Sequence, residues 1–313
     1  AYYKGALAIY EKSPEQNQLN ISRSLSNLAL LYSDQGKTAE VESLCQRSLA
    51  ISEKILGSEH PDVADALHNL ALFHTSQGHY PEAEPLFRRA LAIREKAFGS
   101  EHPNVAQSLD QLGVLYARQG QFKEALPLFL RALEINEKVL GPEHHELAMT
   151  LNNLAATYQR LKTYDKAAIF FRRALAVREK ALGPSHPRVA STALNLGITC
   201  IDMKKYGEAE PLIQRSLDIY EKNFGPEHSA VVNALHIQAN LYGEWKKFDR
   251  AEPLYQRALA VGEKIWSKDH PNLAGVLQDY ALMLQQSGRL QQADELRARA
   301  KAIREKAGAR DRS

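Results

Sequence analysis

The sequence predicts an all-α protein, a right-handed superhelical stack of about seven helical hairpins preceded by half a hairpin. Two observations lead to this prediction. One short phrase recurs every 42 residues along almost the whole chain. Within each interval, apolar residues follow one another at spacings of three and four, the pattern of amphipathic helices. A constant period of this length is typical of arrays in which each repeat packs on its neighbours.

The recurring phrase combines a large apolar residue, a glycine and a histidine. It first reads Leu-Gly-Ser-Glu-His-Pro at positions 56–61, and no insertion or deletion interrupts the register from Ala6 to Lys306. The last copy, which begins at Trp266, keeps the histidine but lacks the glycine. The histidines of the successive copies are His60, His102, His144, His186, His228 and His270.

Each period contains two predicted helices. In the second period we expect one helix over residues 62–77 and another over residues 80–98. Gly99 follows as the expected left-handed cap residue. Prolines also lie near the start of the second helices, at Pro85, Pro127, Pro211 and Pro253. Amide donors there still largely lack acceptors within the helix, so we expect at most a mild bend.

The repeat register predicts a single domain over residues 1–313. Its expected divisions are a partial unit 1–17, full units 18–59, 60–101, 102–143, 144–185, 186–227, 228–269 and 270–307, and a tail 308–313. Residues Tyr3 to Lys12 match the second helix of a preceding unit in phase. We therefore expect the chain to begin halfway through a hairpin and to be a fragment of a larger protein.

Composition argues against several classes of protein. Lys and Arg total 40 against 37 Asp and Glu, and the charges are interspersed, unlike the concentrated basic surface of a nucleic-acid-binding protein. No apolar run approaches the about 20 residues that span a bilayer, and the first residues lack the features of a secretory signal. We expect a cytoplasmic protein that binds neither nucleic acid nor membrane.

The sequence contains no recognisable catalytic or cofactor motif. A Gly-rich phosphate loop, a nucleophile elbow and a dinucleotide fingerprint are all missing. His145-Glu146 begins like a zinc-protease helix, but Met149 stands where the second histidine is required. Cys45 and Cys200 fall at phases that other repeats fill with aromatic or aliphatic residues, so we interpret them as reduced packing residues. We predict no enzyme, no cofactor and no metal.

The six repeated histidines admit two interpretations. The first is a ladder of metal ligands. Stacked repeats place equivalent side chains roughly 10 Å apart, because helices pack at 8–10 Å, whereas zinc ligands lie about 2.0–2.3 Å from the metal. We therefore favour the second interpretation, in which each histidine caps a first helix and packs against the preceding helix.

The aligned units share a large residue, then Leu-Gly or Leu-Ala, Tyr, Ala and an aromatic. The third unit has Leu109, Leu112, Gly113, Tyr116, Ala125, Phe129 and Ala132. The fourth has Leu151, Leu154, Ala155, Tyr158, Ala167, Phe171 and Ala174. This pattern resembles the tetratricopeptide repeat. The 42-residue period and the Glu-Lys ending of the second helix resemble the kinesin light chain type of this repeat.

The small residues of the pattern have a physical role in this interpretation. An alanine at one phase would let the two helices of a hairpin approach closely, whereas a large residue would force them apart. These alanines are Ala83, Ala125, Ala167, Ala209, Ala251 and Ala293.

The resemblance implies a module that binds other proteins. In kinesin light chain-like arrays, asparagines at one phase of the first helix line a peptide-binding groove. The matching phase reads Asn27, Asn69, Gln111, Asn153, Asn195, Ile237 and Asp279, so the resemblance implies this role for its four asparagines. An amide both donates and accepts, so it would hold a peptide backbone. The alternative is a local hydrogen bond within the hairpin.

Five arginines are further candidates for the groove. We expect Arg23, Arg118 and Arg160 on one face of the first helices, and Arg94 and Arg178 near the ends of second helices. They would attract a peptide rich in Asp or Glu through charge-assisted bonds. The alternative is scattered surface arginine. Because the phase of Arg23 is not basic in later units, a continuous basic lining is not expected.

Three functional hypotheses follow. The leading one is a scaffold that captures an extended segment of another protein in its groove. The second is a self-assembly module that associates through its repeat ends, where Tyr2, Tyr3 and Leu7 would be exposed. The third is a regulatory or sensor region of a larger signalling protein. The Glu-Lys helix endings are either a docking surface or a solvated face with local ion pairs.

Overall fold

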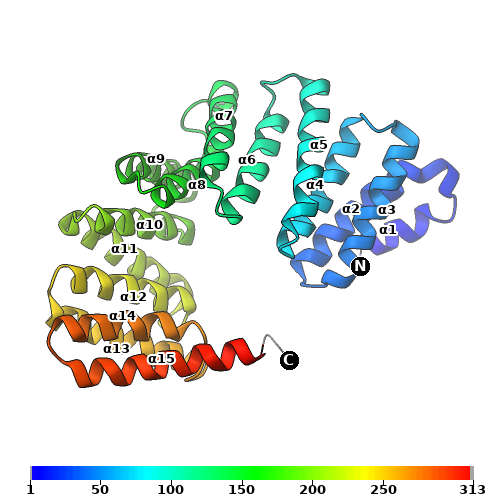
Figure 1. Ribbon diagram of the computed structural model, residues 1–313. Coiled ribbons are helices and arrows are strands. Elements are labelled where there is room, and N and C mark those ends of the chain that lie inside the picture. Colours follow the sequence, from blue (N-terminus) through cyan, green and yellow to red (C-terminus); the bar gives the residue numbers. More distant parts are fainter. Residues whose placement is uncertain (1, 311–313) are drawn as a thin grey trace. The chain divides into compact units, whose positions relative to one another are not determined.

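The computed structural model describes residues 2–310, apart from the side chains of residues 34, 309 and 310. Position 1 of the predicted partial unit and positions 311–313 of the predicted tail lie outside the described residues. Every regular element in the described part is a helix, which confirms the all-α prediction (Figure 1). The chain divides into an N-terminal unit, Ala1–Thr157, and a C-terminal unit, Tyr158–Ser313.

The boundary between the units falls within α8. The N-terminal unit contains α1 (Tyr2–Tyr10), α2 (Pro14–Asp34), α3 (Thr38–Leu56), α4 (Pro61–Ser76), α5 (Tyr80–Phe98), α6 (Pro103–Arg118), α7 (Phe122–Leu140) and most of α8 (Leu147–Arg160). The C-terminal unit contains α9 (Tyr164–Leu182), α10 (Pro187–Asp202), α11 (Tyr206–Phe224), α12 (Ser229–Glu244), α13 (Phe248–Ile265), α14 (Leu273–Gln286) and α15 (Leu290–Arg310). The expectation of one domain over residues 1–313 stays a prediction.

The observed helices follow the predicted pattern closely. The first helix of the second period runs from Pro61 to Ser76, one residue earlier than predicted at each end, and α5 has the predicted bounds. Helices α5, α7, α11 and α13 continue through their prolines. Each of these prolines is the sixth residue of its helix, so it removes one amide that would have bonded to the carbonyl four residues earlier.

Within each unit, consecutive helices pack as hairpins. In the N-terminal unit, α2 packs on α3, α4 on α5 and α6 on α7; in the C-terminal unit, α10 packs on α11, α12 on α13 and α14 on α15. Hairpins of one unit also pack on one another, as α3 does on α4 and α11 on α12. The first helix, α1, packs on α2 in the manner of a second helix without its partner.

The core of each hairpin depends on small residues. The six predicted alanines are all fully buried, as are Phe87 and Phe129 of the second helices. Gly113 of α6 lies so close to Phe129 that an added Cβ would stand 2.8 Å from its ring. The aromatic ring therefore fills the space that the small residue leaves, which is why the two helices approach closely.

The glycine after each second helix differs from the prediction. Gly99 has φ 83° and ψ 162°, whereas a left-handed cap residue would have ψ near about +47°. The positive φ is therefore as expected, but the extended ψ leads the chain away toward the next first helix. Glycine alone enters this backbone region without strain. Ser267, at this phase in the last copy, also has a positive φ, of 132°.

Ion pairs connect the second helices of successive hairpins. Arg131 Nη2 lies 2.7 Å from Glu95 Oε1 of the preceding second helix, and Lys138 Nζ lies 2.8 Å from Glu101 Oε2 in the loop that follows that helix. Ion pairs equivalent to Arg131–Glu95 occur in other repeats: Arg47 with Glu11, Arg89 with Glu53, Arg215 with Glu179, Arg257 with Glu221 and Arg299 with Glu263. The sequence left open a docking surface or a solvated face with local ion pairs, and the Glu-Lys endings mainly pair between neighbouring hairpins.

Candidate functional site

The first helices of the N-terminal unit line a cavity of about 620 Å³, which we call the N-terminal cavity. Asn27 and Leu30 of α2 line it together with Asn69 and Leu72 of α4. These residues occupy matching phases of successive repeats, so the packing of hairpin on hairpin brings them to one surface. An amide and a leucine thus alternate along this face.

The amides of the candidate asparagines are unoccupied in the described part of the structure. No side-chain hydrogen bond is formed by Asn27, Asn69, Asn153 or Asn195 among the described residues. The backbone carbonyls of Asn153 and Asn195 accept bonds from Thr157 and Thr199, at 2.8 Å and 2.9 Å. The local side-chain hydrogen bond that the sequence allowed as an alternative is therefore not observed.

The two arginines that line the N-terminal cavity are both paired. Arg23 is exposed, and its guanidinium lies 3.0 Å from Asp62. Arg94 is buried, and its guanidinium lies 2.6 Å from Asp65 while it donates to Ser108 Oγ at 2.7 Å. The aspartates offset the positive charge, so the cavity lacks the unpaired cations that would attract an acidic peptide.

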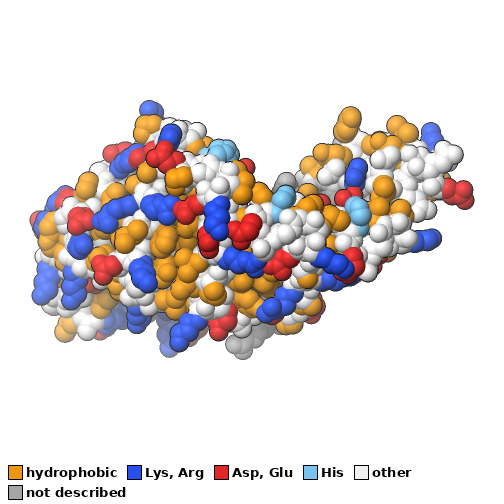
Figure 2. Space-filling view, turned by 90° about the horizontal axis from the view of Figure 1, so that it is seen from above, with side chains coloured by type: hydrophobic (Ala, Val, Ile, Leu, Met, Phe, Trp, Pro, Cys, Tyr) orange, Lys and Arg blue, Asp and Glu red, His pale blue; other side chains and the backbone are white. Residues whose placement is uncertain are grey.

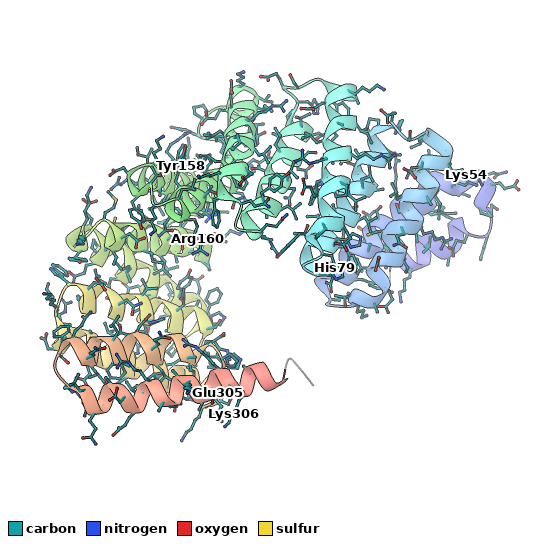
Figure 3. The ribbon with its side chains drawn as sticks, viewed as in Figure 1. Lys54, His79, Tyr158, Arg160, Glu305 and Lys306 are labelled. Carbon is teal, nitrogen blue, oxygen red and sulfur yellow. The ribbon has the colours of Figure 1, made fainter. Side chains whose placement is uncertain are left out.

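The remaining candidates lie outside the N-terminal cavity. Arg118 ends α6 and Arg160 ends α8 (Figure 3), and both are exposed. Arg178 of α9 is half-buried and donates to the carbonyl of Arg188 at 3.2 Å and to Thr192. Arg178 therefore joins a second helix to the following first helix. Of the nine candidates, the structure brings Arg23, Asn27, Asn69 and Arg94 together at one cavity.

The floor of the N-terminal cavity contains polar residues that the sequence reasoning missed. Ser22 Oγ lies 2.8 Å from Ser48 Oγ and 2.7 Å from Ser52 Oγ. His68 also lines the cavity. Burial, with a contribution from the charge of Arg94, lowers the pKa of His68 to about 4. Serines spaced by four on two neighbouring predicted helices were the available signal.

The C-terminal unit has a cavity of its own, which we call the C-terminal cavity, of about 430 Å³. Its lining includes the apolar residues Ile198, Ile237 and Leu282 and the carboxylates Asp202, Glu244 and Asp279. The sequence reasoning did not select Asp202 or Glu244. They occupy the phase of Arg118 and Arg160, so reading that phase to the end of the chain would have revealed a change of sign.

Four of the repeated histidines, His60, His102, His186 and His228, cap helices as predicted, whereas His144 and His270 bond to a residue just before the helix. His102 Nδ1 accepts the backbone N–H of Asn104 at 3.1 Å, and its ring stacks on Phe98 with centroids 4.6 Å apart. The other five make the same bond to the residue two positions on: His60, His144, His186, His228 and His270. Because Nδ1 accepts, the proton of the neutral ring is on Nε2.

One loop brings several potential metal ligands together. Ligand atoms of His144, His145 and Glu146 lie within 4.8 Å of one another, the one such group in the described part of the chain. His144 Nδ1 accepts the N–H of Glu146 at 3.4 Å, the same bond that its equivalents make, although Glu146 lies just before α8. The prediction that the chain holds no metal stays a prediction.

Both cysteines are buried packing residues, as predicted. Cys45 and Cys200 are free thiols with 2% and 1% of their surface exposed. Burial raises the pKa of Cys45 to about 11, and burial also raises the pKa of Cys200. Neither thiol ionises near neutral pH, so neither is suited to act as a nucleophile.

The surface shows no segregation of charge on the face drawn in Figure 2. Lys and Arg side chains are interspersed there with Asp and Glu, and hydrophobic side chains lie between them. Within residues 2–310, no helix combines the length and the apolar character that crossing a bilayer requires.

These features define a class of protein. Hairpins of two helices repeat in one register, and their first helices present polar and apolar side chains around open cavities. This is the architecture of an interaction scaffold. The family model described as tetratricopeptide repeat matches residues 20–96, 62–138, 111–180, 146–222 and 188–264, and the chain belongs to this family.

Solved structures agree with this assignment. A kinesin light chain-type protein with nearly identical TPR-like repeats, from Podospora anserina, is 26% identical with a TM-score of 0.60, covering 66% of this chain and 99% of that chain. BtubC (BKLC) from P. vanneervenii is 22% identical with a TM-score of 0.61, covering 74% and 90%. The apo quorum sensor NprR from B. thuringiensis is 18% identical with a TM-score of 0.71, covering 96% and 80%. No curated protein matches significantly.

Proposed function

We propose that this chain is a non-enzymatic scaffold whose first helices hold an extended segment of a partner protein. The observation that carries the proposal is the pair of unpartnered amides, Asn27 and Asn69, at one cavity. Because an amide both donates and accepts hydrogen bonds, it can satisfy a peptide backbone whatever the side chains are. Leu30 and Leu72 beside them offer apolar contact to those side chains.

The size of the cavity supports this proposal. A volume of about 620 Å³ lies within the range of roughly 300–1,000 Å³ that is usual for ligand sites. The paired arginines Arg23 and Arg94 leave the surface without a strong charge preference. The N-terminal cavity therefore suits backbone recognition better than recognition of an acidic sequence.

The test uses peptides selected from a random display library on the full chain. We expect the variant Asn27→Ala/Asn69→Ala to weaken binding of the selected peptides by roughly tenfold or more, since two charge-free hydrogen bonds contribute about 0.5–1.5 kcal/mol each. Fluorescence anisotropy measures the affinity. Gln46→Ala, at an exposed amide of the second helix α3 outside the cavity, is the matched control and should bind normally. Equal affinity in the double variant and the control would refute this site.

A regulatory role is a second candidate, because the fold is shared with the quorum sensor NprR. In this role, peptide capture would be the input of a larger signalling protein. Self-association through repeat ends also stays a prediction. Sedimentation velocity over a range of concentrations tests it, and a constant sedimentation coefficient would count against it.

A further inference from the structure

The C-terminal cavity has a charge that the N-terminal cavity lacks. The carboxylates of Asp202, Glu244 and Asp279 line it, and Lys204 is the single cation among its described lining residues. The N-terminal cavity instead balances each arginine with an aspartate. The two cavities, although built from the same repeat, therefore present different electrostatic surfaces.

The carboxylates of the C-terminal cavity come from successive first helices. Asp202 ends α10, where it accepts a bond from Gln159 at 3.1 Å, and Glu244 ends α12 at the matching phase. Asp279 of α14 accepts bonds from His236 at 2.8 Å and Asn240 at 3.0 Å. Burial opposes ionisation of Asp279, but these hydrogen bonds outweigh it and lower its pKa. Asp202 and Glu244 are therefore one repeat apart, whereas Asp279 lies at a different phase.

Apolar surface lies beside these carboxylates. Leu282 is 46% exposed although it lines the cavity, and Ile198 and Ile237 are half-buried next to it. Tyr255 closes the floor, where its hydroxyl donates to Asn240 Oδ1 at 2.6 Å. Ile237 occupies the phase that other repeats fill mainly with asparagine or glutamine, so this cavity has exchanged an amide for apolar surface.

We propose that the C-terminal cavity binds an extended segment of a partner protein in which a large apolar side chain is flanked by lysine or arginine. This inference rests on the proposed function and adds the chemistry of the partner. The apolar side chain covers Leu282, Ile198 and Ile237. The two lysine or arginine side chains of the partner pair with the carboxylates of Asp202 and Glu244.

The repeat geometry sets the spacing of the cations. Equivalent residues of neighbouring hairpins lie roughly 10 Å apart, because packed helices lie about 8–10 Å apart. An extended chain advances about 3.3–3.6 Å per residue. Cations about three residues apart therefore match Asp202 and Glu244, and a leucine between them reaches the apolar surface.

The experiment compares two synthetic peptides that differ only in charge. Both peptides carry a leucine between two charged residues that are about three residues apart. The charged residues are lysines in one peptide and glutamates in the other. Fluorescence anisotropy with the full chain at low salt should show the lysine peptide binding roughly threefold to tenfold more tightly, the range for two solvated ion pairs. The variant Asp202→Asn/Glu244→Gln should abolish this difference.

Matched controls distinguish binding at the C-terminal cavity from non-specific electrostatic or hydrophobic binding elsewhere on the protein. Asp218→Asn, exposed on α11, should leave the preference for the lysine peptide unchanged. Leu282→Ser should weaken the lysine peptide, whereas Leu290→Ser, at a 60% exposed leucine outside the cavity, should not. Equal binding of the two peptides, no binding of either, or a preference that survives the double variant would overturn the proposal. The Asn27/Asn69 experiment would stand independently of that outcome.

Discussion

Asp110, on a first helix, shows the free-energy cost of burying a polar side chain in this repeat. Asp110 of α6 accepts a bond from Thr150 at 2.6 Å, but its other carboxylate oxygen is buried without a partner. Burial raises the pKa of Asp110 to about 7. One repeat later the same phase holds Asn152, which carries no charge.

Replacing Asp110 with asparagine should stabilise the protein most at alkaline pH. The folded state holds the proton of Asp110 up to about pH 7, whereas the unfolded state loses it near 3.8. The free energy of unfolding therefore falls as pH rises through this window, and the loss is complete above it. Asp110→Asn should raise the free energy of unfolding by on the order of 1–3 kcal/mol at about pH 8, because each unit of raised pKa corresponds to about 1.4 kcal/mol and the buried amide keeps part of the cost.

Urea denaturation at two pH values checks this prediction. The gain should be smaller at about pH 5, because the folded wild-type protein then holds Asp110 protonated and uncharged, as the amide of the variant always is. Asp218→Asn, at an exposed aspartate, is the control and should change stability little at either pH. A gain of equal size at both pH values would show that the charge of Asp110 is not its cause.

At the scale of the element, the turns between helices require an unusual backbone conformation. The turn inside each hairpin places one residue at a positive φ, between 57° and 84°. This position is occupied by Gly36, Gly78, Gly120, Lys162, Lys204, Lys246 and Gly288. The lysines adopt a left-handed conformation that costs an ordinary residue about 1–2 kcal/mol.

Lys204→Gly should therefore stabilise the C-terminal unit. The net gain should be about 0.5–1 kcal/mol, because glycine relieves the strain but loses more entropy on folding. Thermal unfolding followed by circular dichroism measures it. The neighbouring Lys205 has φ −91°, so Lys205→Gly should be neutral or destabilising. If both variants changed the melting temperature alike, backbone strain at Lys204 would not be the explanation.

At the scale of the whole molecule, stability comes from contacts between helices that follow one another in sequence. Fully buried alanines set the distance within each hairpin, and exposed ion pairs connect one hairpin to the next. The two kinds of contact differ in strength. Packed cores resist added volume, whereas a solvated ion pair contributes little.

Two substitutions in the C-terminal unit should show this difference. Ala209→Leu should lower the free energy of unfolding by about 1–3 kcal/mol, because the fully buried site has no room. Arg215→Ala, which removes the pair with Glu179, should cost about 1 kcal/mol or less. Chemical denaturation compares them, with Ala260→Leu at an exposed position as control. A larger loss from Arg215→Ala than from Ala209→Leu would contradict this ranking.

The sequence by itself determined the helices, their order and the small residues between them. These features are set by neighbouring residues and by a repeated period, so spacing alone predicted α5 to the residue. The histidine caps belong to the same class, because each bond reaches only two residues along the chain. Even so, the sequence did not foresee the extended ψ of Gly99, which depends on where the next helix must begin.

Only the tertiary structure decided which side chains meet at a cavity. Asp65 pairs with Arg94 across 29 residues, and Arg23 with Asp62 across 39. The first pair joins the two helices of one hairpin, and the second joins neighbouring hairpins. Both pairs therefore depend on how helices pack, and several partners compete for each charge. The sequence therefore indicated amides and arginines as candidates. Only the packing showed that the amides form no hydrogen bond within the described residues and that Arg23 and Arg94 are paired with aspartates.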